Sequence, residues 1–140
     1  METSDELRRI TENFYDLFVT GDTSVADRYI ENQDGLLVIG TDPREWWSEY
    51  ESIMSALKAQ AGELSQVGLK IRRDREVQAY QEGSVGWVAD RPTFVFPDGT
   101  EVEMRVTGVF REHVDGWKLV QWHASLGVAN EEAIGQELTI

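Results

Sequence analysis

Hydrophobic residues recur at helical spacing through the first part of the chain and at alternating spacing through the rest. The helical pattern covers residues 7–18 and 25–30, and it returns between Asp42, an expected N-cap, and Gly62, an expected C-cap. A short apolar run at residues 36–39 predicts a strand between the second and third helices. The order helix, helix, strand, helix is therefore expected at the start of the chain.

Four longer segments with alternating apolar residues follow the third helix. They predict strands over residues 66–80, 84–96, 101–112 and 117–128. Asp98-Gly99 and Asp115-Gly116 separate the last three, and Asp-Gly between alternating segments is a strong hairpin signal. Helices followed by an antiparallel meander are typical of the α+β class, in which helices cover one face of a sheet. No repeat or linker interrupts residues 1–140, so we predict a single domain.

The strand register predicts which side chains share a face, provided that both Asp-Gly turns are two-residue loops. Counting back from these turns pairs Asp90 with Thr107 and Gly108 with His123. The face toward the helices is then expected to carry Trp87, Arg91, Val95, Met104, Val106, Phe110, Trp117, Leu119, Gln121, His123 and Ser125. The opposite face is expected to carry Asp90, Phe94, Glu103, Arg105, Val109, Val120, Trp122 and Leu126. A one-residue bulge in any strand would exchange the two faces beyond it.

Both predicted faces of the meander are apolar, and the three helices can cover only one of them. The uncovered face is therefore expected to pack against a second copy in a two-fold homodimer. The expected interface residues are Phe94, Arg105, Val120 and Trp122. A cross-strand ion pair between Asp90 and Arg105 is expected at the same interface.

The net charge of the chain limits the classes of molecule that it is expected to bind. Thirteen basic and 26 acidic residues give a formal net charge of −13, which repels phosphate backbones and disfavours nucleic acid and anionic membranes. No apolar run reaches the roughly 18 residues that span a bilayer, so a cytoplasmic protein is expected. The chain has no cysteine and only two histidines, His113 and His123, so neither a metal nor a cofactor is expected.

The last predicted strand carries the sharpest candidate for chemistry. Trp117, Leu119, Gln121, His123 and Ser125 alternate along it, and this row becomes more polar toward its end. Such a gradient indicates a strand that runs from a packed core into a cavity. His123 is a candidate general acid/base, because imidazole exchanges protons near neutral pH. The alternative is a core histidine that is hydrogen-bonded to a neighbour.

Aromatic residues and one arginine would complete such a cavity. Arg91, among apolar neighbours, needs an anionic partner, which is either a protein carboxylate or a ligand. An aromatic cage for a planar or apolar ligand, or else ordinary core, is expected from Trp46, Trp47, Tyr50 and Trp87. The expected ligand-binding residues are Trp46, Tyr50, Trp87, Arg91, Phe110, Gln121 and His123.

Several motifs, in this order, resemble the SnoaL-like group of the nuclear-transport-factor-2-like (NTF2-like) superfamily. They are Gly40-Thr41-Asp42-Pro43 with Glu45-Trp46-Trp47, Gly86-Trp87-Val88-Ala89-Asp90, Asp98-Gly99-Thr100, Arg105-Val106-Thr107, and the run from Gly116 to Ser125. The resemblance implies a cone-shaped α+β barrel in which three N-terminal helices pack on a curved antiparallel sheet and close an apolar pocket. It also implies homodimers that pack through the convex face of the sheet.

Ketosteroid isomerase, an enzyme with this fold, combines a tyrosine, a protonated aspartic acid and a second aspartate as base. Tyr15 matches this layout poorly, because it lies about 110° from the centre of the apolar face of the first helix, which Phe14 occupies. Asp42 is expected to cap a helix, and Asp90 is expected to face away from the pocket. Isomerase chemistry of that kind is therefore not expected.

Three functions are open at this point. The first is a SnoaL-like protein that binds a small apolar or planar organic molecule. The second is a cofactor-independent isomerase, cyclase or hydratase in which His123 transfers protons and Gln121 or Arg91 steadies an oxyanion. The third is a non-catalytic homodimerisation module whose interior is filled by its own side chains. The first two functions require a cavity inside the fold, whereas the third predicts that none is present.

Overall fold

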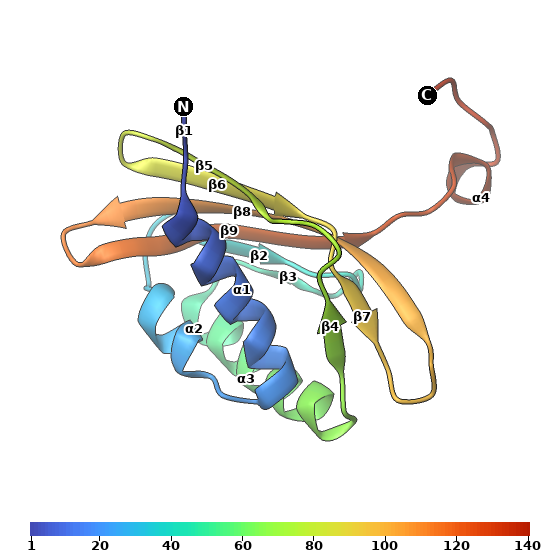
Figure 1. Cartoon of the computed structure of the whole chain (residues 1–140), viewed down its shortest axis with the longest axis horizontal. Coiled ribbons are helices and arrows are strands. Elements are labelled where there is room, and N and C mark those ends of the chain that lie inside the picture. The colour runs from blue at the N-terminus through green and yellow to red at the C-terminus, as the bar shows by residue number, and fades with distance from the viewer.

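The computed structural model describes residues 1–140 and shows helices packed on one face of a curved sheet (Figure 1). The first half of the chain contributes β1 (Glu2–Thr3), α1 (Asp5–Thr20), α2 (Ser24–Tyr29), β2 (Leu37–Ile39), β3 (Trp46–Trp47) and α3 (Tyr50–Gln66). The second half contributes β4 (Lys70–Arg72), β5 (Gln78–Glu82), β6 (Val85–Asp90), β7 (Thr93–Val95), β8 (Glu101–His113), β9 (Gly116–Leu126) and α4 (Asn130–Ile134). The predicted α+β class is confirmed.

The strands pair in the order β1-β5-β6-β8-β9-β2-β3, and β7 joins β4 to the start of β8. Strand β2 runs parallel to β9, whereas the other pairs are antiparallel. Helices α1, α2 and α3 lie on one side of the sheet, and the segment that carries α4 extends away from the body (Figure 1). We call the face toward the three helices the inner face and the opposite one the outer face. No helix is both long and apolar enough to cross a membrane.

Helix α1 has the caps that its flanking residues favour. The Ser4 hydroxyl accepts a hydrogen bond from the Leu7 amide at 3.2 Å. Gly21 ends the helix in the left-handed conformation, and its amide donates to the Leu17 carbonyl at 2.9 Å. The buried side of the helix is wider than one stripe, because both the sheet and α3 pack against it. Tyr15 lies within this wide side and is only 3 % exposed.

Helix α3 begins at Tyr50, so the prediction of a helix start at Asp42-Pro43 is wrong. Asp42 caps a tight turn instead, and its carboxylate accepts a hydrogen bond from the Arg44 amide at 2.8 Å. Further hydrogen bonds from the Arg44 guanidinium lower the pKa of the Asp42 carboxyl to about 2. The turn sends the two tryptophans that follow it into β3, which pairs with β2. Strand pairing therefore overrides a local helix-start signal.

The two strands predicted over residues 66–80 and 84–96 are each divided in two. Residues 73–77 separate β4 from β5, and Arg91-Pro92 separates β6 from β7. Proline has no amide hydrogen and cannot continue a ladder of strand hydrogen bonds. Beyond this break, β4 and β7 turn down beside the helices (Figure 1).

The loop between β7 and β8 is one residue longer than the prediction assumed. Val95 pairs with Glu101, and Gly99 has a positive φ of 90° within a three-residue loop over residues 97–99. The extra residue shifts the register, so that Asp90 opposes Val106 on the inner face. Trp87 moves to the outer face, where its ring stacks on Tyr80 with 5.0 Å between centroids.

A β-bulge between β8 and β9 shifts the register a second time. Phe110 pairs with Leu119 but Val109 pairs with Gln121, so Val120 is the extra residue. Before the bulge, the inner face holds the side chains that the sequence predicted, among them Phe110 and Leu119. Beyond the bulge the predicted faces are exchanged. Trp122 and Ala124 lie on the inner face, and Gln121, His123 and Ser125 lie on the outer face.

Candidate ligand cavity

A cavity of about 410 Å³ lies between the helices and the inner face of the sheet, and we call it the inner cavity. Fifteen of the twenty residues that line it are hydrophobic. These fifteen are Tyr15, Phe18, Val38, Ile39, Trp47, Leu57, Leu64, Phe94, Phe96, Val102, Met104, Val106, Trp122, Ala124 and Leu126. The other five are Gly40, Thr41, Glu45, Gln60 and Glu63.

Two tryptophans stand in one row of the sheet in the wall of the inner cavity. Val38 pairs with Trp47 on one side and with Trp122 on the other. Trp122 also lies over Gly108, where an added Cβ would approach the indole to 3.0 Å. Phe14 packs on Trp122 from helix α1, with ring centroids 5.6 Å apart. These contacts hold the Trp122 ring in place as part of the wall.

Glu45 is the polar group that the structure holds most firmly in the inner cavity. Its Oε1 accepts a hydrogen bond from the Asp42 amide at 3.0 Å, and its Oε2 accepts one from Gln60 Nε2 at 3.1 Å. Glu63 also lines the cavity and is exposed. No lysine, arginine or histidine is among the twenty lining residues. The cavity therefore combines apolar walls with carboxylates and no basic group.

Tyr15 joins the inner cavity to a buried carboxyl group. Its hydroxyl donates a hydrogen bond to Asp90 Oδ2 at 2.8 Å, and Asp90 is 9 % exposed. Burial raises the pKa of the Asp90 carboxyl, although the hydrogen bond from Tyr15 acts in the opposite direction. Burial, followed by the neighbouring Asp90 charge, raises the pKa of the Tyr15 hydroxyl well above its usual range. Tyr15 therefore keeps its proton at neutral pH and shares it with Asp90.

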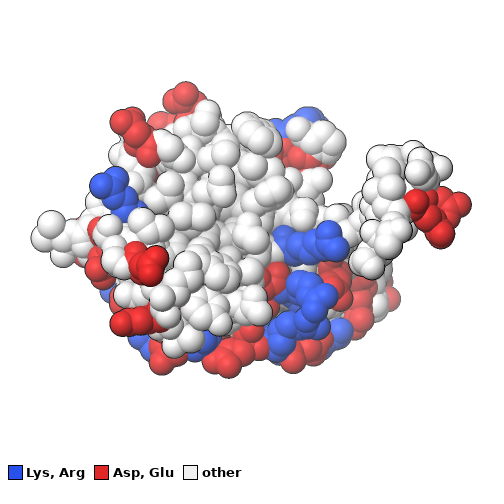
Figure 2. Space-filling model, turned by 90° about the horizontal axis from the view of Figure 1, so that it is seen from above, with Lys and Arg blue, Asp and Glu red and all other residues white.

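A polar hollow of about 560 Å³ lies on the outer side of the same strands, and we call it the outer cleft. Its basic residues are Arg75, Arg91, Arg105 and His123. Arg91 lies 4.0 Å from a carboxylate oxygen of Glu103, which is the outer limit of an ion pair. Figure 2 shows a group of basic side chains with acidic ones beside them on this face, next to a broad uncharged area.

The seven residues predicted to bind a ligand lie outside the inner cavity. Trp46 is 65 % exposed, Phe110 is fully buried in the core, and Tyr50 packs against the core. The remaining four lie on the outer side because of the two register shifts. They are Trp87, Arg91, Gln121 and His123.

Two of the four residues predicted for a dimer interface line the inner cavity instead. These are Phe94 and Trp122, which the shifted register carries to the inner face. Arg105 lies on the outer face as predicted, and Val120 is the half-buried residue of the bulge. The predicted ion pair between Asp90 and Arg105 is wrong, because the Asp90 carboxylate bonds to Tyr15.

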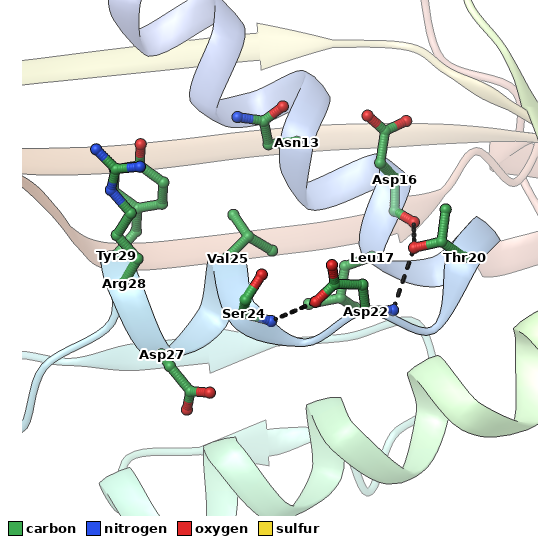
Figure 3. Close-up of a pocket in the computed structure, with 10 residues that line it drawn as sticks. All are labelled: Asn13, Asp16, Leu17, Thr20, Asp22, Ser24, Val25, Asp27, Arg28 and Tyr29. Atoms are coloured by element: carbon green, nitrogen blue, oxygen red, sulfur yellow. Dashed lines mark hydrogen bonds between the residues drawn. The ribbon is translucent and has the colours of Figure 1, made fainter.

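A third hollow, of about 710 Å³, lies between α1 and α2 but lacks converging side chains (Figure 3). Asp16 and Asp27 point to opposite sides of it. Asp22 accepts a hydrogen bond from the Ser24 amide at 3.0 Å and so belongs to the helix start. No group of three or more His, Asp or Glu residues is placed to hold a metal ion. The inner cavity is therefore the candidate site.

Glu45 and Tyr15 are the cavity residues that sequence reasoning missed as site candidates. Glu45 appears in the sequence only as part of the motif Glu45-Trp46-Trp47, and no local pattern assigns it to a binding site. Tyr15 follows Phe14 on a helix whose buried side proves wide. No sequence signal connects Tyr15 with Asp90, because that contact spans 75 residues.

A sequence profile described as the SnoaL-like domain matches residues 7–129 of the chain. No match was found among curated proteins.

Solved structures share the fold at low sequence identity. An NTF2-like protein of unknown function from Pseudomonas putida KT2440 is 13 % identical and has a TM-score of 0.78, over 97 % of this chain and 96 % of that one. A proposed dehydratase of the NTF2-like family from Streptomyces avermitilis is 18 % identical and has a TM-score of 0.71, over 89 % of this chain and 96 % of that one. A proposed ketosteroid isomerase from Shewanella frigidimarina NCIMB 400 is 15 % identical and has a TM-score of 0.67, over 84 % of this chain and 92 % of that one. These similarities establish the fold.

Proposed function

This chain belongs to the SnoaL-like family of the NTF2-like superfamily, and from that premise we propose that it binds a small apolar or planar organic molecule in the inner cavity. The observation that carries the proposal is the cavity of about 410 Å³ with fifteen hydrophobic residues among the twenty that line it. Small-molecule sites are typically about 300–1,000 Å³ and mostly apolar, with a few placed polar groups. The inner cavity has this size and this composition.

The energetic basis of the proposed binding is the removal of apolar surface from water. Transfer of apolar surface into such a cavity gains roughly 25 cal/mol per Å². The flat faces of Trp47 and Trp122 suit a planar ring, because offset stacking and edge contacts add to the gain from burial. Glu45 and Gln60 are the groups that would orient a polar substituent of the ligand.

A fluorescent probe tests the proposal directly. N-phenyl-naphthylamine is neutral, apolar and brighter in a dry site, and we expect saturable binding to the wild-type protein. The variant Ala124→Phe should weaken this binding at least about tenfold, because the new ring occupies the cavity. Ser125→Phe is the matched control, since it adds the same ring to the next residue of β9 on the outer face. Equal loss of binding in both variants, or no binding by the wild type, would contradict the proposal.

The second candidate function is cofactor-independent proton transfer on a bound ligand. The position of Tyr15 in the cavity favours it: a cavity carboxylate, Glu45 or Glu63, takes a proton from the ligand and returns it to another carbon, while the Tyr15 hydroxyl, which keeps its own proton, donates a hydrogen bond to the oxygen that is negative between the two steps. His123 no longer serves this hypothesis, since it lies in the outer cleft. The test is turnover of a β,γ-unsaturated ketone by wild type and Tyr15→Phe. A wild-type rate equal to that of buffer alone would reject this candidate.

We also propose that the outer face packs against a second copy of the chain. The support is the broad uncharged area of that face in Figure 2, and the strand register independently places the stacked rings of Tyr80 and Trp87 on the outer face. Trp87→Glu should shift the protein toward monomers in sedimentation analysis, whereas Trp46→Glu at the edge strand should not. A wild-type protein that is already monomeric at high concentration would contradict this proposal.

A further inference from the structure

The inner cavity carries negative charge and no balancing positive charge. Glu45 and Glu63 are among its twenty lining residues, and none of the twenty is a lysine, arginine or histidine. We propose that the ligand of this cavity is an organic cation, with an apolar or aromatic body and a protonated amine that binds Glu45. This inference rests on the proposed function and adds the charge of the ligand to it.

The carboxylate of Glu45 is fixed in position by neutral hydrogen-bond donors, and the charge of Arg44 acts on it only from outside ion-pair distance. One oxygen accepts the Asp42 amide at 3.0 Å and the other accepts Gln60 Nε2 at 3.1 Å. None of the ion pairs in the structure includes Glu45, and the nearby Arg44 is paired with Asp42. A half-buried carboxylate that is hydrogen-bonded only to neutral groups gains from a cation, which compensates its partial loss of hydration.

Gly40 shows that the backbone leaves space for this carboxylate. A Cβ at Gly40 would lie 2.5 Å from Glu45 Oε2 and 2.9 Å from Glu45 Cβ. The second contact involves an atom next to the backbone, which cannot move aside as the end of a side chain can. Any larger residue at position 40 would therefore displace Glu45 from its place in the cavity wall.

The aromatic side chains in the cavity wall also favour a positively charged ligand. Trp47, Trp122, Phe94 and Phe96 line the cavity together with Glu45. Ring faces attract ammonium groups, and tryptophan does so best. A carboxylate beside aromatic faces thus favours a protonated amine over a neutral group, and it disfavours an anion.

Three probes with one ring system separate the possibilities. Naphthylmethylamine, naphthylmethanol and naphthoate are respectively a cation, a neutral molecule and an anion at neutral pH. Calorimetry with the wild-type protein should give about tenfold tighter binding of the amine than of the alcohol, with the naphthoate weakest. Glu45→Gln should bring the amine down to the affinity of the alcohol and leave the alcohol unchanged. Gly40→Ala should act in the same direction by displacing Glu45.

Glu51→Gln is the matched control, because it removes the same charge from an exposed position of α3 outside the cavity. Its amine preference should equal that of the wild type. An alcohol that binds as tightly as the amine to the wild type would overturn the inference and leave the proposed function standing. Equal loss of preference in Glu51→Gln and Glu45→Gln would also overturn it, because general charge would then be the cause. Binding of none of the three probes would overturn the proposed function as well.

Discussion

The inner cavity and the outer cleft lie on opposite sides of the same strands, yet their side chains differ in kind. The inner cavity is apolar and contains two glutamates without a basic residue. The outer cleft contains three arginines and His123 among mostly polar neighbours. Consecutive residues of β9 illustrate the contrast, because Ala124 lines the inner cavity and Ser125 lines the outer cleft.

The chemical environment of each side chain in a strand depends on the register of that strand. Successive side chains alternate between faces, so a shift of one residue moves every side chain to the other environment. The bulge at Val120 does this within a single strand. It carries Trp122 to the cavity wall and His123 to the outer cleft, which reverses the two roles that the plain alternation predicts.

Truncation of neighbouring residues of β9, one at a time, should have unequal effects on stability if one of them faces the inner cavity and the next faces the outer cleft. Trp122→Ala should lower the free energy of unfolding by roughly 2–3 kcal/mol, below the ~3–5 kcal/mol typical of a fully buried tryptophan, because one side of the ring borders the cavity. His123→Ala, on the outer face, should change it by less than about 0.5 kcal/mol. Urea unfolding of both variants measures the difference. Similar losses at the two positions would mean that the bulge does not divide the strand as described.

Much of the fold is predictable from local patterns in this sequence. The apolar spacing of α1 and the order of helices before a meander predict the α+β architecture. The hairpin between β8 and β9 also follows from the turn signal at Asp115-Gly116, although the two loop residues are Val114 and Asp115. These features depend on contacts between residues that are close in sequence. Such contacts produce a periodic pattern of apolar residues that can be recognised in the sequence.

The residues of the cavity walls are not predictable in the same way. They depend on single extra residues in a loop and in a strand, which the alternation of apolar and polar residues does not reveal. One extra residue in the loop over residues 97–99 and one at Val120 reversed the faces of β6 and of the end of β9. The pairing of β3 with β2 is also decided at a distance, since β2 itself pairs with β9 across more than eighty residues. Local helix-start signals at Asp42-Pro43 cannot compete with that pairing.

The Tyr15–Asp90 hydrogen bond lies on the inner face where the two regions meet, because Tyr15 lines the inner cavity and Asp90, the last residue of β6, also borders the outer cleft. Tyr15→Phe should lower the free energy of unfolding by about 1–2 kcal/mol, since a buried carboxyl group loses its hydrogen-bond donor. Tyr29→Phe is the control, because Tyr29 also packs on Phe14 but its hydroxyl forms no hydrogen bond within the protein. Thermal unfolding followed by circular dichroism measures both. An equal effect of the two substitutions would show that the hydroxyl of Tyr15 contributes nothing beyond its ring.

The pH dependence of stability should distinguish the buried acid Asp90 from an exposed acid by a small difference in slope. Burial raises the pKa of Asp90 above the ordinary value of 3.8, so the folded state holds this proton more tightly than the unfolded chain does. The stability contributed by Asp90 is therefore present at low pH and falls as the pH rises through the folded pKa. Asp90→Asn retains an oxygen that can accept from Tyr15 but removes the titration. Its stability relative to the wild type should increase from acidic to neutral pH.

Asp98→Asn should show the opposite trend with pH. The two substitutions together therefore test whether the pKa of Asp90 is raised while that of Asp98 is lowered. The Thr100 amide donates to the Asp98 carboxylate at 2.9 Å, which lowers the pKa of this exposed group below 3.8. Its contribution is present above the unfolded pKa and is lost as the pH falls, so Asp98→Asn should lose stability relative to the wild type from acidic to neutral pH. Urea unfolding across this range measures both slopes. Parallel slopes for the two variants would show that Asp90 titrates like an exposed acid and that burial beside Tyr15 does not raise its pKa.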